Sequence, residues 1–287
     1  MTAIYFKELK SCFSGMLGYL LEGFMLLIGG LYFTSIGLQQ GYGEFGYILY
    51  STNFILLIVI PLLTMRAFAE ERRTKTEQLL LTAPVTIPQI VLGKYCSVVT
   101  LVAFPVLVYS LYPLILRTGG GFSLAAAYSC LMCYFLMACA CIAVGIFLSN
   151  LVENQIMAAL LTFCVLLVSY LMGSIQQMFT AGNLLSLVVL AAVVLAAALL
   201  VGINCRSLTA GCAVFCGGAI LLAILYKVQS AALISLLTSL LGTLALFQPF
   251  VVFVSGMFSV KAIVYYLSVI GFFLFLTGKS IEKRRWN

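Results

Sequence analysis

Charged residues divide this sequence into apolar intervals, and several intervals are long enough to cross a lipid bilayer as a helix. A transmembrane helix needs about 20 consecutive, mainly apolar residues. About eight spans are predicted: 23–43, 45–65, 95–116, 118–152, two within 154–205 on either side of a break near Gly182 and Asn183, 207–226, and 262–278. The bilayer core has no water to hydrogen-bond the backbone, so each span is expected to be an α-helix. The predicted fold is therefore all-α, a polytopic transmembrane helical bundle that forms a single domain over residues 1–287.

The balance of residue types excludes a soluble fold and most enzyme classes. Hydrophobic residues make up 64% of the chain and charged residues only 8%, whereas an average soluble domain has about 25% charged residues. The chain contains no His, and all eight acidic residues are Glu. Hydrolases with a His base, enzymes that hold magnesium on Asp and bis-His haem carriers all need residues that are missing here. We therefore do not expect an enzyme.

The ten cysteines are interpreted as small apolar packing residues. They are spread through the apolar intervals, as in the pairs Cys130/Cys133 and Cys139/Cys141. No His or Asp lies beside them to complete a metal site. No metal ligand is assigned, and no cofactor is expected to bind to this chain.

Lysine and arginine residues gather on one predicted side of the membrane. Eight spans place both termini on the same side, and the chain has 15 Lys and Arg residues. Only Arg117, Lys227 and Lys261 then lie on the opposite side, and the other twelve satisfy the positive-inside rule if the termini are cytoplasmic. We expect a multi-pass protein of the plasma membrane, the inner membrane in a bacterium. The net charge of +7 follows from this topology and gives no reason to expect a nucleic-acid partner.

Two segments are expected to lie at the membrane surface. Glycine, glutamine and proline residues interrupt the apolar run of 228–260, which predicts interfacial or re-entrant helices. Residues 2–14 mix apolar side chains with two lysines and a glutamate, a pattern typical of a short amphipathic helix on the inner membrane face. A simple polar flank of the first span is the alternative for 2–14.

The main polar stretch, residues 66–94, lies between the second and third predicted spans. A helix over 68–82 is predicted, because Glu71 with Lys75 and Arg73 with Glu77 form i,i+4 pairs. A second helix is predicted to begin at Thr86, where a capping box with Gln89 and an early proline mark a helix start. We expect a soluble partner to bind this stretch, and a solvated loop is the alternative.

The same stretch resembles a segment of a known transporter family. It reads Arg66-Ala-Phe-Ala-Glu-Glu-Arg-Arg-Thr-Lys-Thr-Glu-Gln-Leu-Leu-Leu-Thr-Ala-Pro-Val, followed by Gly93-Lys94. It is similar to the cytoplasmic segment of type 2 ABC exporter permeases, particularly the gliding-motility-type subgroup, in which a coupling helix contacts the ATPase subunit. The resemblance implies ATPase contacts at Glu70, Glu71, Arg72, Arg73, Thr76 and Glu77. It also implies that Leu79, Leu80 and Leu81 anchor the coupling helix.

A second resemblance lies at the C-terminus. Tyr265-Tyr266-Leu267-Ser268, Phe275-Leu276-Thr277 and Glu282-Lys283-Arg284-Arg285-Trp286 are similar to the last span and basic tail of this family. The two matches frame residues 1–165 and 255–287. Many relatives have six spans, so the stretch 181–254 departs from the pattern as an inserted helical pair.

The chain is not expected to bind ATP itself. Gly278-Lys279-Ser280 looks like the end of a phosphate-binding loop, but Phe273 stands where that motif needs glycine. The resemblance implies that ATP and magnesium bind to a separate ABC ATPase subunit. It further implies that a second permease chain completes the translocation path, as a homodimer or a heterodimer.

Two polar residues within the spans are candidates for the translocation path. Glu22 lies early in the first span and Asn53 in the second. Polar side chains inside a membrane are costly and are commonly functional. Glu22 also lies near enough to the cytoplasmic end to reach the headgroups, and Asn53 is suited to an interhelical hydrogen bond.

The leading hypothesis is the permease subunit of an ABC exporter, embedded in membrane lipid and driven by a partner ATPase. An ion-coupled secondary transporter is the alternative, although it would need ionisable residues near the bilayer midplane and paired halves. A membrane anchor or assembly factor without transport is the other alternative. The sequence does not identify the cargo.

Overall fold

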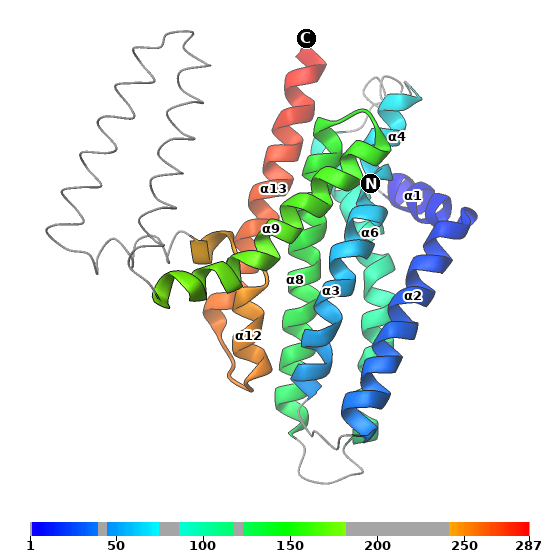
Figure 1. Cartoon of the computed structure of the whole chain (residues 1–287). Helices are drawn as coiled ribbons and strands as arrows, with labels where there is room; N and C mark the ends of the chain where they lie inside the picture. Colours follow the sequence, from blue (N-terminus) through cyan, green and yellow to red (C-terminus); the bar gives the residue numbers. More distant parts are fainter. Residues whose placement is uncertain (1, 40–44, 75–85, 117–122, 182–240, 287) are drawn as a thin grey trace, which may run out of the picture. The chain divides into compact units, whose positions relative to one another are not determined.

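The computed structural model describes residues 2–39, 45–74, 86–116, 123–181 and 241–286. Every element in these ranges is helical, which confirms the all-α prediction (Figure 1). The elements are α1 Thr2–Ser14, α2 Met16–Tyr32, the π-helix η1 Phe33–Gln39, α3 Phe45–Thr64, α4 Arg66–Arg73, α6 Ile87–Tyr109, α7 Tyr112–Leu116, α8 Leu124–Leu151, α9 Gln155–Ala181, α12 Gln248–Val254 and α13 Val260–Trp286.

The chain divides into two compact units. The first comprises Met1–Val168 and Leu246–Asn287, and the second comprises Ser169–Ala245. In the described part of the second unit, the hydroxyl of Ser169 donates a hydrogen bond of 2.8 Å to the carbonyl of Leu244. The first unit contains α1 to α8, the start of α9, α12 and α13, and it holds the polar residues considered below.

Six stretches of the described residues are long and apolar enough to cross a membrane. They are Gly18–Gln39, Phe45–Arg73, Ile87–Leu116, Leu124–Leu151, Gln155–Gln176 and Val260–Arg284. Each matches one predicted span, as expected of a multi-pass membrane protein. The other two predicted spans, and the break near Gly182 and Asn183, lie outside the described residues.

Several helix boundaries differ from the predicted span boundaries. The first stretch begins at Gly18 and not at residue 23, the second continues past residue 65 to Arg73, and the third begins at Ile87 and not at residue 95. The predictions placed the boundaries at charged residues, whereas helices end where caps and packing end them. Glu22 therefore lies inside the helix of the first span. The polar residues of α4 lengthen the second span, and those at the start of α6 lengthen the third.

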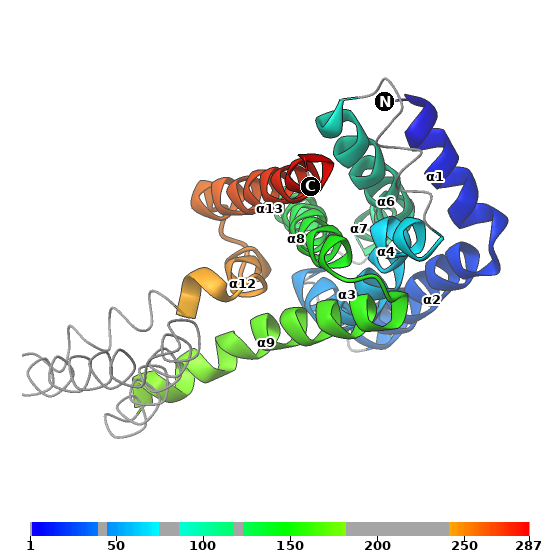
Figure 2. The same ribbon diagram turned by 90° about the horizontal axis from the view of Figure 1, so that it is seen from above.

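The central helix of the first unit is α8, which contacts α3, α4, α6, α12 and α13 (Figure 2). Of the most apolar 18-residue window of α8, 78% is buried inside the protein, compared with 17% of the corresponding window of α13. Small residues allow this close packing, since a Cβ added at Gly145 would lie 2.5 Å from Thr64 Oγ1 of α3. Four cysteines of α8 are buried as free thiols, in keeping with their interpretation as packing residues: Cys130, Cys133, Cys139 and Cys141.

The described part of 228–260 contains the short helix α12. Its seven residues span only about 10 Å, too short to cross a bilayer. It packs against α3 and α8, and a Cβ added at Gly46 of α3 would lie 2.9 Å from the backbone of Val254. Gly256, with φ of 77°, then turns the chain towards α13. The interfacial or re-entrant assignment of the whole stretch stays a prediction.

The first helix, α1, lies across one end of the first unit. It contacts α2 and α6, and Figures 1 and 2 together show it at the edge of the bundle, beside α6. Gly15 has an extended backbone and separates α1 from α2. The start of α1 and the end of α13 lie towards the same end of the bundle as α4 (Figure 1).

Candidate functional site

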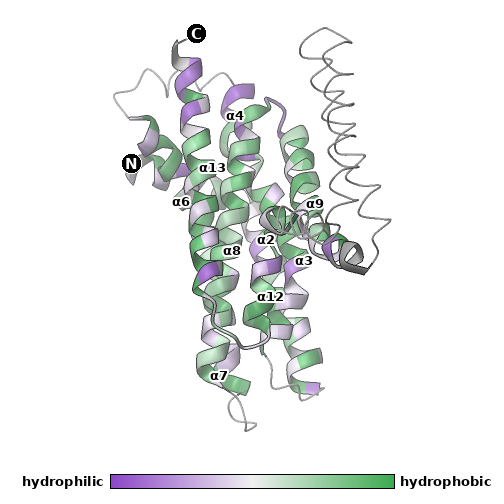
Figure 3. Ribbon diagram, turned by 90° about the vertical axis from the view of Figure 1, so that its left-hand side faces the viewer, coloured by the Kyte–Doolittle hydropathy of each residue, from purple (hydrophilic) through white to green (hydrophobic). Residues whose placement is uncertain are grey.

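Many hydrophilic residues of the first unit lie at the end where α1, α4 and the last turns of α13 lie (Figure 3). Along the rest of the helices most residues are hydrophobic, with single hydrophilic residues among them (Figure 3). This polar end contains the part of the predicted partner-binding segment that the structure describes, residues 66–74 and 86–94.

Ser149 of α8 fixes the joint between α3 and α4. Met65 separates the two helices, and its N–H donates to the carbonyl of Pro61 at 2.9 Å. The Ser149 hydroxyl donates to the Met65 carbonyl at 3.2 Å and accepts from the N–H groups of Phe68 and Ala69 at 3.3 and 3.4 Å. These bonds satisfy amide groups that the first turn of a helix leaves unpaired. The joint is therefore held by the end of α8.

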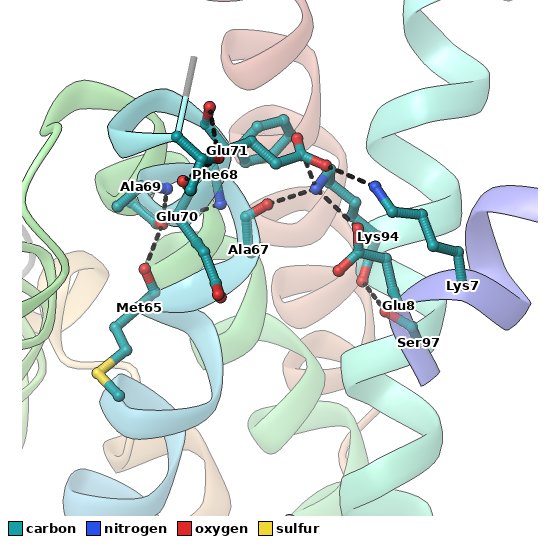
Figure 4. A network of polar contacts seen from close by, with 12 residues as sticks. Lys7, Glu8, Met65, Ala67, Phe68, Ala69, Glu70, Glu71, Lys94 and Ser97 are labelled. Carbon is teal, nitrogen blue, oxygen red and sulfur yellow. Dashed lines mark hydrogen bonds and ion pairs between the residues drawn. The ribbon is translucent and has the colours of Figure 1, made fainter. Parts of the chain in front are cut away.

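Lys94 of α6 is the centre of a buried charge cluster (Figure 4). Its side chain is 1% exposed, and its Nζ lies 3.0 Å from Glu8 Oε1 of α1 and 2.9 Å from Glu71 Oε2 of α4. The ammonium also donates to the carbonyl of Ala67 and lies 4.9 Å from the ring centroid of Phe68. The ammonium thus has three polar partners, with hydrogen bonds to Glu8 and Ala67 and an ion pair with Glu71. A buried charge is tolerated when it is paired in this way.

Lys7 adds a second cation to the cluster. Its Nζ lies 3.3 Å from Glu71 Oε1, and its side chain is 60% exposed. The exposed Lys7 contact contributes little free energy, so the buried contacts of Lys94 dominate. We call Lys7, Glu8, Glu71 and Lys94 the Lys94 cluster; it joins α1, α4 and α6 and has no net charge.

Asn150 joins a second set of helices at the same end. Its Oδ1 accepts from Arg72 Nη2 of α4 at 3.4 Å and from Arg284 Nη1 of α13 at 3.1 Å. Arg284 Nη2 also donates to the backbone carbonyl of Asn150 at 2.7 Å. An arginine at the end of a helix pairs well with the last carbonyls, which carry partial negative charge. Hydrogen bonds to Asn150 therefore hold both α4 and α13 against the end of α8.

The predicted partner-contact residues occupy different environments. Glu71 points into the protein within the Lys94 cluster, Arg72 is half-buried against Asn150, Glu70 is half-buried, and Arg73 is exposed. Thr76, Glu77, Leu79, Leu80 and Leu81 lie outside the described residues. Contact between any of these residues and an ATPase stays a prediction.

The helix predicted over 68–82 begins earlier than expected, and its residues 75–82 lie outside the described residues. α4 starts at Arg66 and ends at Arg73, with Thr74 as its C-cap. The hydroxyl of Thr74 donates to the carbonyl of Glu70 at 2.9 Å. The same carbonyl accepts the backbone N–H of Thr74 at 3.0 Å, so Thr74 caps the end of α4 with both its backbone and its side chain.

The predicted helix start at Thr86 is confirmed. Thr86 and Gln89 form a capping box, in which the Thr86 N–H donates to Gln89 Oε1 at 3.4 Å, and Pro88 lies in the first turn. The helix then continues without a break into the third span. Lys94 lies two turns from this start, so the capping box sets the register of the Lys94 cluster.

The two path candidates, Glu22 and Asn53, lie apart from the Lys94 cluster on α2 and α3. Glu22 Oε1 is buried without a hydrogen-bond partner, and so are both amide atoms of Asn53, which is fully buried. Among the described residues, no positively charged side chain pairs with Glu22. The role of Glu22 and Asn53 in translocation stays a prediction.

Sequence reasoning missed Glu8, Asn150 and Arg284 as parts of this site. One signal was present, because Lys94 follows apolar residues inside a predicted helix and a lysine there needs a carboxylate partner. No local pattern identifies Asn150, since its two arginine partners come from distant parts of the chain. Among the described residues, no group of three His, Cys, Asp or Glu side chains could hold a metal ion.

A family model described as "ABC-2 family transporter protein" matches residues 30–192, more than half of the chain. No curated protein and no solved structure matches the chain. The matched range includes α3, α4, α6 and α8, and therefore Glu71, Lys94 and Asn150, whereas Glu8 and Arg284 lie outside it.

Proposed function

This chain belongs to the ABC-2 family of transporter proteins, and we propose that it is the permease subunit of an ATP-driven exporter. A separate ABC ATPase subunit binds ATP and magnesium, and a second permease chain completes the path through the plasma membrane. The chain has about eight spans, both termini are cytoplasmic, and the segment that resembles the gliding-motility-type subgroup receives the ATPase. The common location of α1, α4 and the end of α13 supports this topology.

The observation that carries the proposal is the attachment of α4 to the rest of the first unit. Lys94 pairs with Glu71 of α4 and Glu8 of α1, and Ser149 and Asn150 hold α4 against α8. Removing one partner from a buried ion pair costs about 3–5 kcal/mol, so α4 does not move independently of α1, α6 and α8. Force applied to α4 is then transmitted to the spans, as mechanical coupling requires.

The two faces of α4 have separate roles in this proposal. Ala67, Phe68, Ala69 and Glu71 are buried and hold the helix in place. Arg73 is exposed and Glu70 is half-buried, so these two side chains are available to the ATPase. Glu71 positions α4 through its ion pairs with Lys94 and Lys7.

The first experiment tests binding of the ATPase. The chain is purified from its own cells in mild detergent, and copurification of an ABC ATPase is measured for the wild type and for Arg73→Glu. We expect the wild type to recover the ATPase and Arg73→Glu to recover much less, because a reversed charge at an interface rim opposes association. Lys261→Glu, which reverses an exposed cation at the other end of α13, should behave as the wild type. Absence of an ABC ATPase from the wild-type preparation contradicts the proposal.

The second experiment separates coupling from anchoring. Hydrogen exchange of α1 and α6 is measured in the complex with and without ATP and vanadate. We expect nucleotide-dependent changes in both helices of the wild type, and loss of the change in α1 for Glu8→Gln while the ATPase stays bound. A wild-type complex without any change in these helices would identify a membrane anchor.

A further inference from the structure

A groove of about 580 Å³ lies between the first turns of α6 and the last turns of α13, within the first unit. Ligand pockets in proteins typically have volumes of about 300–1,000 Å³. Its apolar lining includes Val91 and Leu92 of α6 and Leu274 and Phe275 of α13. Leu92 and Phe275 are 40% and 62% exposed, so the groove opens on the apolar outer surface of two membrane-spanning helices.

One end of the groove carries a cation and an anion side by side. Lys279 and Glu282 both line it, and Lys279 Nζ lies 2.7 Å from Glu282 Oε2. The two side chains are 59% and 46% exposed, so this ion pair at the polar end of the groove is weak. The ammonium of Lys279 also lies 5.9 Å from the ring centroid of Phe275, where the apolar lining begins.

We propose that this groove binds one phospholipid with a zwitterionic, hydrogen-bonding headgroup of the phosphatidylethanolamine type. One acyl chain lies along Leu92, Leu274 and Phe275. The lipid phosphate replaces Glu282 beside Lys279, and the lipid ammonium pairs with the released Glu282 carboxylate. An anionic headgroup of the phosphatidylglycerol type would leave its phosphate beside an uncompensated carboxylate. The proposal requires a membrane location and is independent of transport.

Gly278 provides a variant that fills the groove without disturbing the fold. It lines the groove, and a Cβ added there meets no atom within 4 Å. Gly271 lies two turns earlier on the same helix, is equally open, and does not line the groove. Gly278→Leu therefore blocks the site, and Gly271→Leu is its matched control.

The test uses native mass spectrometry of the purified, delipidated chain after incubation with vesicles of phosphatidylethanolamine, phosphatidylcholine or phosphatidylglycerol. The wild type is expected to retain one phosphatidylethanolamine about fivefold more than phosphatidylglycerol. Phosphatidylcholine, whose quaternary ammonium has no N–H to donate, is expected to be retained less than phosphatidylethanolamine. Gly278→Leu should lose this lipid and Gly271→Leu should retain it, with equal thermal stability for both variants.

A charge variant tests the role of the headgroup. Lys279→Met with Glu282→Gln should keep binding lipid through the apolar lining but lose the preference between headgroups. Equal retention of phosphatidylglycerol and phosphatidylethanolamine by the wild type would overturn the proposal. Unchanged retention in Gly278→Leu would place the lipid elsewhere on the surface and would overturn it as well.

Discussion

Lys94 Nζ lies 2.9 Å from Glu71 Oε2, and this buried ion pair joins α6 to α4. The same ammonium lies 3.0 Å from Glu8 Oε1 of α1. One cation thus holds two carboxylates from separate helices, and neither carboxylate is as exposed as an ordinary surface glutamate, at 10% for Glu71 and 16% for Glu8. A substitution of Lys94 therefore affects the packing of α1, α4 and α6 together.

Replacing Lys94 by methionine should destabilise the protein strongly. Lys94→Met keeps the apolar stem but leaves Glu8 and Glu71 without their buried cation, which costs about 3–5 kcal/mol. Unfolding in detergent, followed by circular dichroism against denaturant, measures the loss. Lys261→Met removes an exposed lysine of α13 and should change stability by less than about 0.5 kcal/mol. Equal stability of the two variants would contradict the assigned role of Lys94.

The neighbouring glutamates of α4 should respond differently to neutralisation. Glu71→Gln removes a charge that pairs with Lys94, and it should lower the free energy of unfolding by about 3 kcal/mol or more. Glu70→Gln changes a half-buried residue of the same helix and should cost about 0.5 kcal/mol or less. The same unfolding measurement compares them. If Glu70→Gln is the more damaging variant, the inward direction of Glu71 is wrong.

The contrast between Glu70 and Glu71 also shows which contacts can be predicted from the sequence alone. The i,i+4 pattern offered Lys75 as the partner of Glu71, because local rules see only neighbours on one helix. Lys75 lies outside the described residues, and the structure adds ion pairs of Glu71 with Lys94 and Lys7, which tertiary packing brings together from two other helices. Six spans were predictable because length and hydropathy are local properties, and so was the start of α6 at Thr86, because a capping box involves residues three positions apart.

The end of α4 and the junction at Asn150 were not predictable for the same reason. α4 ends at Arg73 with Thr74 as its C-cap, and α8 supplies Ser149 and Asn150 to hold it. Only the folded arrangement places the end of α8 beside α4 and α13. The sequence therefore located the polar segment correctly, but it could not say which of its charges face inward.

The contact of Gly145 with Thr64 should make the centre of the bundle sensitive to one methyl group. Gly145→Ala would place Cβ 2.5 Å from Thr64 Oγ1, in a helix that is buried on most sides. Such overpacking costs about 1–3 kcal/mol. Gly271→Ala adds the same methyl group on α13, where no atom lies within 4 Å, and should be neutral or stabilising because alanine favours helices. Thermal unfolding of both variants tests the difference, and a stable Gly145→Ala would show that α3 and α8 are not in close contact.

Cys12 of α1 reports on the Lys94 cluster through its reactivity. Burial, followed by the negative charge of Glu8, raises the pKa of the Cys12 thiol above its ordinary value, and Glu70 adds a smaller effect in the same direction. Only the thiolate reacts with iodoacetamide, so the rate of alkylation at Cys12 should increase at higher pH than for an unperturbed thiol. Glu8→Gln removes a repulsive charge, which should lower the pKa of Cys12 and move the rate profile to lower pH. Glu70→Gln should move it in the same direction by less. Mass spectrometry of the α1 peptide across a pH series measures both shifts, and an unchanged profile in Glu8→Gln would mean that α1 does not hold Glu8 beside Cys12 in the membrane.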